Sequence, residues 1–258
     1  LDNTFDGDGK FSYSLTKKSL ACQKILLQPD GKIIAAGQLD TIVDPYFRNE
    51  FFAMRLNADG SVDPSFGNNG MMRAKNSNSD NCYNAGLLPD GRIVLAGFSQ
   101  FTGYNTSSAL CLKSNGTVDQ TFGTSGWVYL SFFNATSSIM YGVAVQGNGK
   151  VILAGTAMYS PSYVNAIALA RLNSDGTMDA TFGNGGMDTS FVSASGMGCN
   201  DVVLQPDGKI VITGYKMQTH DYFMTARYRN TPQLQKTTLT VVAHPQISGV
   251  TLYPDPVN

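Results

Sequence analysis

A ten-residue phrase recurs four times along the chain at nearly constant spacing. Its turn glycines, Gly31, Gly91, Gly149 and Gly208, lie 60, 58 and 59 residues apart. The four copies read QPDGKIIAAG, LPDGRIVLAG, QGNGKVILAG and QPDGKIVITG, and they begin at Gln28, Leu88, Gln146 and Gln205. A second phrase keeps the same period and reads LDNTFDGDG from Leu1, VDPSFGNNG from Val62, VDQTFGTSG from Val118 and MDATFGNGG from Met178. A regular period with a turn signal in each unit predicts a repeat architecture.

The first phrase has the chemistry of a tight β-hairpin. In its first copy an apolar run ends at Pro29-Asp30-Gly31, and a second apolar run follows at once. Proline presets φ, aspartate bonds its own backbone, and glycine adopts a positive φ without strain. Asn148 replaces the aspartate in the third copy and also tolerates the left-handed region. The repeated glycines therefore indicate a backbone requirement and not a phosphate-binding loop.

Each unit predicts four strands, which in the first unit are residues 21–28, 32–37, 51–57 and 71–75. The fourth unit lacks its last strand, and we expect Lys10–Leu15 at the other end of the chain to supply it. Four-stranded antiparallel sheets repeated radially form a β-propeller, and closing the ring removes exposed edges. We therefore predict an all-β fold over residues 1–230, a four-bladed β-propeller closed by the N-terminal strand. An open stack or part of a larger ring is the alternative. Residues 231–258 are expected to be a linker and the start of a truncated C-terminal module.

Composition excludes several classes of partner. Charged residues make up only 14% of the chain and the net charge is −1, which argues against nucleic acid as a partner. No apolar run approaches the roughly 20 residues of a transmembrane segment. The chain begins inside a repeat phrase, so we expect no signal peptide in it.

The phrases L-D-x-T-F-G-x-x-G, Q-P-D-G-K-I and A-x-R-L-N-x-D-G resemble the delta-60 repeat family, also called the DUF5122 β-propeller repeat. The resemblance covers about residues 1–230 and implies a propeller in a secreted or surface bacterial protein, without catalytic residues. The end of the chain, Leu252–Asn258, is similar to the opening of the type IX secretion sorting domain of Bacteroidota, although Asp255 stands where that domain usually has asparagine. This second resemblance implies export across the outer membrane to the cell surface, with the type IX secretion machinery as a partner through a missing C-terminal domain.

Two further sets of residues recur with the repeat and indicate buried contacts. Phenylalanines of the second phrase are expected to wedge between blades: Phe5, Phe66, Phe122 and Phe182. Aspartates and bases in fourfold register predict one structural ion pair per blade, and they are Asp2, Asp63, Asp119 and Asp179 with Arg55, Lys113, Arg171 and Arg227. The alternative function of this set is a ring for an anionic ligand.

Cysteines occupy one register position in three units. Cys22, Cys82 and Cys199 begin the first strand, and Met140 takes that place in the third unit. We interpret them as small residues filling a tight centre. A soft-metal site and a disulfide remain the alternatives, and Cys111 is expected in the core. The Asp-Gly turns weakly resemble calcium-binding loops but are too short for one, so we favour bulged turns. We predict no metal and no cofactor.

The connections between second and third strands, and between blades, vary in every unit, whereas the other turns are repeated. A repeated scaffold with variable loops on one face is the usual division between framework and binding site. We predict ligand-binding residues on that face: Tyr46, Phe47, Phe101, Tyr104, Tyr159, Tyr163, His220 and Tyr222. The competing interpretation is that these aromatics cover the edge of the ring.

No catalytic motif accompanies these aromatics, and the chain has only two histidines, His220 and His244. The sequence therefore favours a secreted or surface non-catalytic adhesion module that binds a glycan or a surface protein. A polysaccharide-active hydrolase or lyase, and a structural spacer, are the alternatives.

Overall fold

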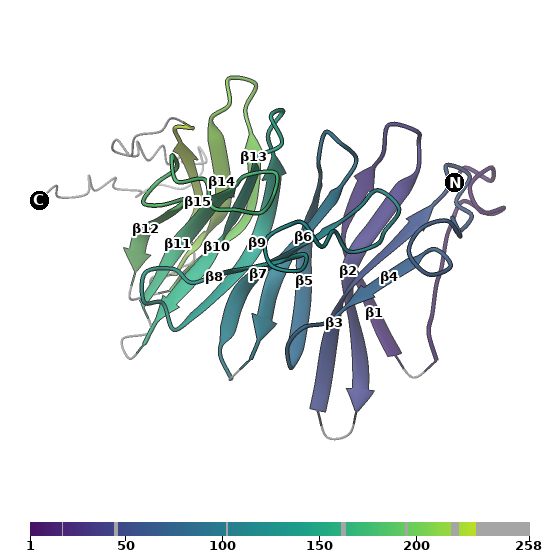
Figure 1. Cartoon of the computed structure of the whole chain (residues 1–258), viewed down its shortest axis with the longest axis horizontal. Helices are drawn as coiled ribbons and strands as arrows, with labels where there is room; N and C mark the ends of the chain where they lie inside the picture. Colours follow the sequence, from purple (N-terminus) through teal and green to yellow (C-terminus); the bar gives the residue numbers. More distant parts are fainter. Residues whose placement is uncertain are drawn as a thin grey trace, which may run out of the picture.

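The computed structural model describes residues 1–16, 18–43, 46–101, 103–160, 164–193, 196–217 and 222–230, with the backbone alone for 41–43, 46, 47, 191 and 192. It shows four antiparallel sheets, which we call blades 1 to 4, standing in a row with the N-terminus at one end (Figure 1). Within these ranges no helix is long and apolar enough to cross a membrane. The predicted all-β class and its division into four repeated sheets are confirmed.

Each blade contains consecutive strands paired in sequence order. Blade 1 consists of β1 (Lys18–Leu27), β2 (Ile33–Val43), β3 (Tyr46–Leu56) and β4 (Met71–Ala74). Blade 2 consists of β5 (Ser79–Leu87), β6 (Ile93–Gln100), β7 (Asn105–Leu112) and β8 (Trp127–Leu130). Blade 3 consists of β9 (Ser137–Val145), β10 (Val151–Tyr159), β11 (Val164–Leu172) and β12 (Met187–Ser193). Blade 4 has three strands in the described ranges, β13 (Met197–Leu204), β14 (Ile210–Lys216) and β15 (Tyr222–Tyr228).

The first phrase forms the predicted hairpin in every blade. Gly31 has a φ of 83°, its N–H donates to the Gln28 carbonyl at 2.9 Å, and the Gln28 N–H donates to the Lys32 carbonyl at 2.8 Å. The same pair of bonds recurs at the other three turns. These turns line one edge of the row, while the β2–β3 and β6–β7 turns lie at the opposite edge (Figure 1).

Strands extend through most of the segments that we expected to be long variable loops. In blade 1 the pairing runs without interruption from Gln38↔Phe51 to Val43↔Tyr46, which leaves only residues 44–45 between the strands. The segment is rich in β-branched and aromatic residues, which favour strands. The prediction that strands 32–37 and 51–57 are joined by a variable loop is therefore wrong for most of residues 38–50, because variable sequence does not exclude regular strands.

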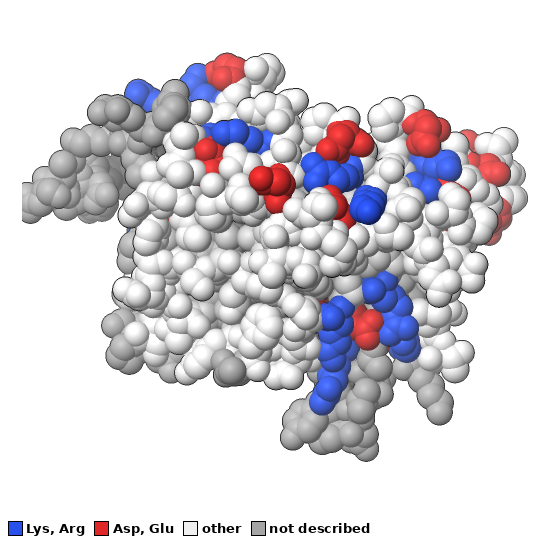
Figure 2. Space-filling view, in the orientation of Figure 1, with Lys and Arg blue, Asp and Glu red and all other residues white. Residues whose placement is uncertain are grey.

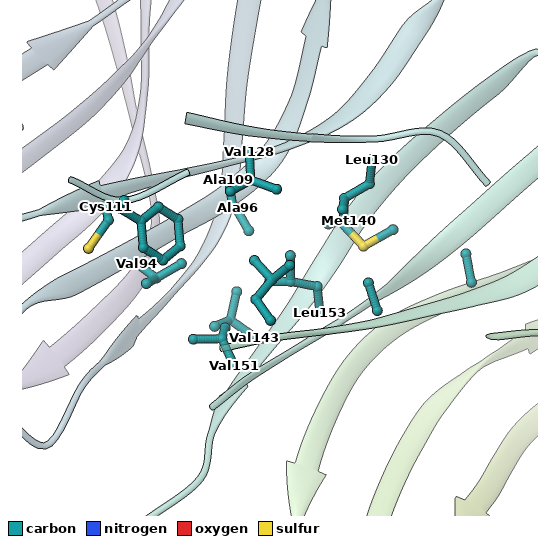
Figure 3. Packing of buried hydrophobic residues seen from close by; sticks show 14 of the residues in the cluster. Val94, Ala96, Ala109, Cys111, Val128, Leu130, Met140, Val143, Val151 and Leu153 are labelled. Atoms are coloured by element: carbon teal, nitrogen blue, oxygen red, sulfur yellow. The ribbon is translucent and has the colours of Figure 1, made fainter. Parts of the chain in front are cut away.

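The cores lie between blades. One apolar cluster joins blades 1 and 2, a second joins blades 2 and 3, and a third joins blades 3 and 4. In the second cluster, Val94 and Ala96 of blade 2 face Val143 and Leu153 of blade 3 (Figure 3). Blades 2 and 3 therefore contribute apolar residues from both faces, as sheets must when they have a neighbour on each side.

The phenylalanines of the second phrase connect each blade to the next. Phe66 is fully buried, and the N–H of Gly67 donates to the carbonyl of Asn115 in the turn of blade 2 at 2.7 Å. A Cβ on Gly116 in that turn would lie 2.8 Å from the Phe66 ring, so the turn needs glycine. We call this arrangement the Phe–turn contact. It recurs between blades 2 and 3, where Phe122 lies against Gly176, and it confirms the predicted wedge.

The N-terminal segment makes the same contact with blade 1. Phe5 packs beside Gly60, and the N–H of Asp6 donates to the carbonyl of Asp59 at 2.7 Å. Residues 1–9 therefore hold the place that the second phrase of a preceding blade would occupy.

Closure of the ring by the N-terminal strand is not confirmed. Residues 10–15 form no strand, and Phe11 and Leu15 pack against an apolar cluster of blade 1 that includes Phe52 and Met54. Blade 4 and the N-terminus lie at opposite ends of the row (Figure 1). Residues 10–15 thus cover the apolar surface of blade 1, the blade that follows them in the sequence. In the described ranges the sheet of blade 4 ends at β15.

Candidate ligand-binding surface

The repeated aspartates form structural ion groups in blades 1 and 3. Asp63 accepts from Lys32 Nζ and Arg55 Nε, both at 2.7 Å, and its second carboxylate oxygen accepts from the N–H and hydroxyl of Ser65. Burial alone would raise the pKa of Asp63, but the bonds from Lys32 and Ser65 and the charge of Arg55 hold that pKa well below its ordinary value. Asp179 has the same arrangement in blade 3. These carboxylates and bases satisfy one another, so the alternative of an anion-binding ring has no support here.

In blade 2 the buried aspartate pairs with a base that does not lie on the third strand. Pairing with Val94 places Cys111, and not Lys113, at the position that Arg55 holds in blade 1. The ion pair to Asp119 comes instead from Arg92 in the hairpin turn, at 3.0 Å. The prediction of Lys113 was wrong by two residues: Cys111 precedes Asp119 by eight positions, as Arg55 precedes Asp63, so Lys113 holds the turn position of Asn57. Lys113 is exposed.

Two of the thiols at the start of the first strands lie in different cores. Cys82 belongs to the core between blades 1 and 2, and Cys199 to the core between blades 3 and 4. Each thiol donates to a carbonyl two residues on in its own strand. Burial raises the pKa of both thiols to about 12, which keeps them protonated. The described cysteines, including exposed Cys22, form no disulfide, and Cys111 lies in the core as predicted.

The Asp-Gly turns use their carboxylates within the turn. Asp59 Oδ1 accepts from the N–H and the hydroxyl of Ser61, at 3.0 and 2.6 Å, and Asp175 does the same with Thr177. The described ranges hold no cluster of three or more His, Cys, Asp or Glu side chains suited to a metal ion. The bulged-turn interpretation therefore accounts for these residues.

Two of the predicted aromatics lie together at the β6–β7 turn, at the edge of the molecule with variable connections. Phe101 is 40% exposed and Tyr104 is 57% exposed. Phe101 meets the ring of Tyr129 edge-on, with centroids 5.1 Å apart. Tyr129 stacks on Trp127 at 6.0 Å, and Trp127 packs on Phe51 of blade 1 at 5.2 Å. The exposed ring of Phe101 is thus the end of a row of aromatics anchored in the core.

Amide side chains surround this row. Asn78 Nδ2 donates to the Phe101 carbonyl at 2.8 Å, and Asn76 Nδ2 donates to the Tyr129 hydroxyl at 2.8 Å. The connection before β5 is itself fixed, because buried Asp80 accepts from the N–H groups of Asn76 and Ser77. We call Phe101, Tyr104, Tyr129, Asn76 and Asn78 the blade 2 tip. It combines exposed aromatic rings with neutral hydrogen-bonding groups on a rigid support.

The described structure does not place the other predicted site residues at the blade 2 tip. Tyr159 is half-buried and packs against the core between blades 2 and 3. Tyr222 is 39% exposed on β15 of blade 4. Tyr46 and Phe47 lie in β3, and their side chains are outside the described set, as are Tyr163 and His220 altogether.

Sequence reasoning missed a second aromatic pair on the first strands of the blades. Tyr83 and Tyr141 stack with centroids 5.2 Å apart, and Phe98 flanks Tyr83 at 5.9 Å. Each tyrosine is the extra residue of a β-bulge, and Gln23 and Asn200 hold the same position in blades 1 and 4. The signal was present in the sequence, because all four follow directly the register position of the cysteines and Met140.

Polar groups of distant blades meet beside this pair. Asn84 Nδ2 donates to the Tyr141 carbonyl at 2.8 Å and to Asp201 Oδ1 at 3.3 Å, which links blades 2, 3 and 4. Burial raises the pKa of Asp40, and the charge of this carboxylate adds to the effect of burial in raising the pKa of Tyr83. The first strands therefore converge closely enough for residues 117 positions apart to bond.

Comparison with known proteins supports the repeat interpretation. Residues 28–66, 88–122 and 146–182 match the family model described as "Domain of unknown function (DUF5122) beta-propeller". These stretches lie in three of the four units and begin at the hairpin phrase, so the β-propeller repeat is supported by both sequence and structure. A search of curated proteins finds no match.

Solved structures show distant similarity. One is a glycosyl hydrolase from Bacteroides ovatus, at 12% identity and a TM-score of 0.41, covering 80% of this chain and 65% of that one. Another is described as "The GH130 family of mannoside phosphorylases contains glycoside hydrolases that target beta-1,2 mannosidic linkages in Candida mannan", at 10% identity and a TM-score of 0.36, covering 78% of this chain and 64% of that one. The chain thus spans slightly less than two thirds of each, and we draw no functional argument from either.

Proposed function

We propose that this repeat protein is a non-catalytic binding module that recognises a glycan through the blade 2 tip. The observation that carries the proposal is the exposure of Phe101 and Tyr104 on a support of stacked aromatic rings. Aromatic faces pack against the apolar faces of sugars, and Asn and Tyr side chains bond to hydroxyls without requiring charge. A site of this kind needs little reordering on binding, which lowers its entropic cost.

The five side chains of the blade 2 tip are all uncharged, which suits a neutral ligand. In the view of Figure 2, charged side chains gather along the edge with the hairpin turns and in one patch near the opposite edge, and the broad face between them is largely uncharged. A surface protein is the second candidate partner, because exposed aromatics also anchor protein interfaces.

Binding measurements on a double variant test the proposal. We expect Phe101→Ala with Tyr104→Ala to weaken glycan binding at least about tenfold, since aromatic contacts of this kind contribute about 1 kcal/mol or more each. A glycan array on the intact protein identifies the ligand, and calorimetry compares the variants. Phe133→Ala is the matched control, because Phe133 is also 40% exposed and lies outside the tip.

Unchanged affinity in the double variant, with unchanged melting temperature, would place the site elsewhere. Tyr46, Phe47, Tyr159, Tyr163, His220 and Tyr222 would then be the next positions to replace. Turnover of the bound glycan would favour the alternative of a hydrolase or lyase. Absence of any ligand would favour a structural spacer.

The cellular setting is also a proposal. Secretion to the outer-membrane surface, with engagement of the type IX machinery, depends on the resemblance of Leu252–Asn258, which lie outside the described residues. Detection of the native protein in the surface fraction of its source cells tests this proposal. Closure of the four blades into one ring through Lys10–Leu15 likewise stays a prediction.

A further inference from the structure

Blade 4 carries the bases of an ion group without its aspartate. Its register equivalents of Lys32 and Arg55 are Lys209 and Arg227. In blades 1 and 3 the aspartate follows the arginine by eight positions, and that place after Arg227 holds Gln235 in the sequence. Among the described residues, Lys209 pairs with Asp207 of its own exposed turn, and no carboxylate lies within ion-pair distance of Arg227.

The N-terminus carries the aspartate without its bases. Asp2 Oδ1 accepts from the N–H and hydroxyl of Thr4 at 3.0 and 2.7 Å, the same distances that Asp63 Oδ1 shows to Ser65. The backbone bonds from Phe5 to Asp2 and from Gly9 to Phe5 also repeat those of the second phrase in blade 1. Among the described residues no Lys or Arg pairs with Asp2. The phrase is therefore already folded as one half of the group.

The two ends of the row also expose apolar side chains whose equivalents are buried between internal blades. Phe223 holds the register position of Phe51, which is fully buried against Trp127 of the following blade, but Phe223 is 71% exposed. At the other end of the row, Ile25 and Leu27 of blade 1 are 64% and 71% exposed. Their equivalents in blade 2, Ala85 and Leu87, pack in the core between blades 1 and 2.

We propose that the outer face of blade 4 binds the N-terminal phrase and blade 1 of a second copy of this chain, head to tail. Asp2 of the second copy would accept from Lys209 and Arg227, and its residues 10–15 would lie beside β15 as a fourth strand. Residues 1–9 of the same chain lie at the opposite end of the row (Figure 1), so in this arrangement a second copy supplies them to the outer face of blade 4.

The internal blades give the geometry of the proposed contact. The guanidinium of Arg55 lies 4.9 Å from the Phe66 ring centroid, and that of Arg171 lies 4.8 Å from the Phe182 centroid. Arg227 should lie in the same way over Phe5 of the second copy while it pairs with Asp2. A head-to-tail contact of this type is heterologous, so it closes into a ring of chains or extends as a filament.

Sedimentation equilibrium of the intact protein over a range of concentrations tests the proposal. Wild type is expected to associate. Asp2→Ala and the double variant Lys209→Ala/Arg227→Ala should each weaken association about 30-fold or more, because each leaves a desolvated charge without its partner. Lys113→Ala removes an exposed base from blade 2 and is the matched control, with unchanged association.

Mixing the two variants separates a second copy from closure of one chain. The Asp2→Ala copy keeps a complete blade 4 face, and the Lys209→Ala/Arg227→Ala copy keeps a complete N-terminal phrase. An equimolar mixture should therefore form a one-to-one dimer that goes no further. A wild type that stays monomeric at all concentrations would overturn the proposal. If both variants then also melt at lower temperature than wild type, the ring closes within one chain.

Discussion

At the scale of single residues, the carboxylate of Asp179 shows how the repeat tolerates buried charge. One oxygen of Asp179 accepts hydrogen bonds from Lys150 Nζ at 2.6 Å and from Arg171 Nε at 2.5 Å. The other oxygen accepts a hydrogen bond from the hydroxyl of Thr181. Burial alone would raise the pKa of Asp179, but the bonds from Lys150 and Thr181 and the charge of Arg171 hold that pKa well below its ordinary value. Every hydrogen-bonding oxygen thus has partners, which is the condition for burying such a pair.

This arrangement predicts a specific loss of stability in acid. Because the folded pKa of Asp179 lies below its unfolded value of about 4, its contribution is complete above that pH and is lost as pH falls. Asp179→Asn should lower the free energy of unfolding at pH 7 by about 3–5 kcal/mol, and it should weaken the pH dependence below pH 4. Urea denaturation between pH 2 and 7 measures both, with Asp30→Asn in an exposed turn as the control. Equal pH profiles in wild type and the Asp179 variant would contradict the argument.

At the scale of elements, the β-bulge in the first strand of each blade explains a glycine that turn chemistry does not. Gly97 lies opposite Cys82, next to the bulge, and a Cβ there would come within 1.8 Å of the Asn81 carbonyl oxygen. A Cβ on Gly37, Gly155 or Gly214 would come within 1.9 Å of the corresponding carbonyl oxygen. The last glycine of the repeated phrase is therefore required by the close approach of two strands, and its φ is not left-handed.

We expect Gly97→Ala to destabilise the protein by about 3 kcal/mol or more, because backbone atoms on both strands would have to separate. Gly147→Ala is the matched control, since a Cβ at Gly147 meets nothing within 4 Å, and its effect should stay within about 0.5 kcal/mol. Thermal melting and urea titration of both variants decide the matter. A Gly97→Ala protein as stable as wild type would show that the bulge can relax.

At the scale of the whole molecule, the period and the turn chemistry predicted four sheets and their hairpins, because those features depend on residues close in sequence. The extension of β2 and β3 was missed because variable sequence resembled a loop. The stacking of Tyr83 on Tyr141 depends on how neighbouring blades converge, and the replacement of Lys113 by Arg92 depends on register within a sheet. In the proposed blade 2 tip, Phe101 and Tyr104 could be named from their place in a variable connection, whereas Tyr129 and the asparagines come together only through the fold.

The N-terminal segment gives a prediction at this scale. Removal of residues 1–15 should expose the apolar face of blade 1 that includes Leu39, Phe52 and Met54, all now buried. Hydrogen exchange should then become faster in β3 and β4 while β9 to β11 keep their protection, because the segment packs on blade 1 and a local opening affects the elements around it first. Exchange that rises equally in all blades would instead show that the row unfolds as one unit.

The Phe–turn contact also has a consequence for how such a chain can change over generations. Each contact joins a phenylalanine from one unit to a glycine turn in the next, and the partners are the same at successive junctions. Recombination that duplicates or deletes one whole period of about 59 residues would therefore leave a complete contact at the new junction, wherever in the unit the crossover falls. As far as this contact is concerned, the number of blades can thus change without a compensating substitution.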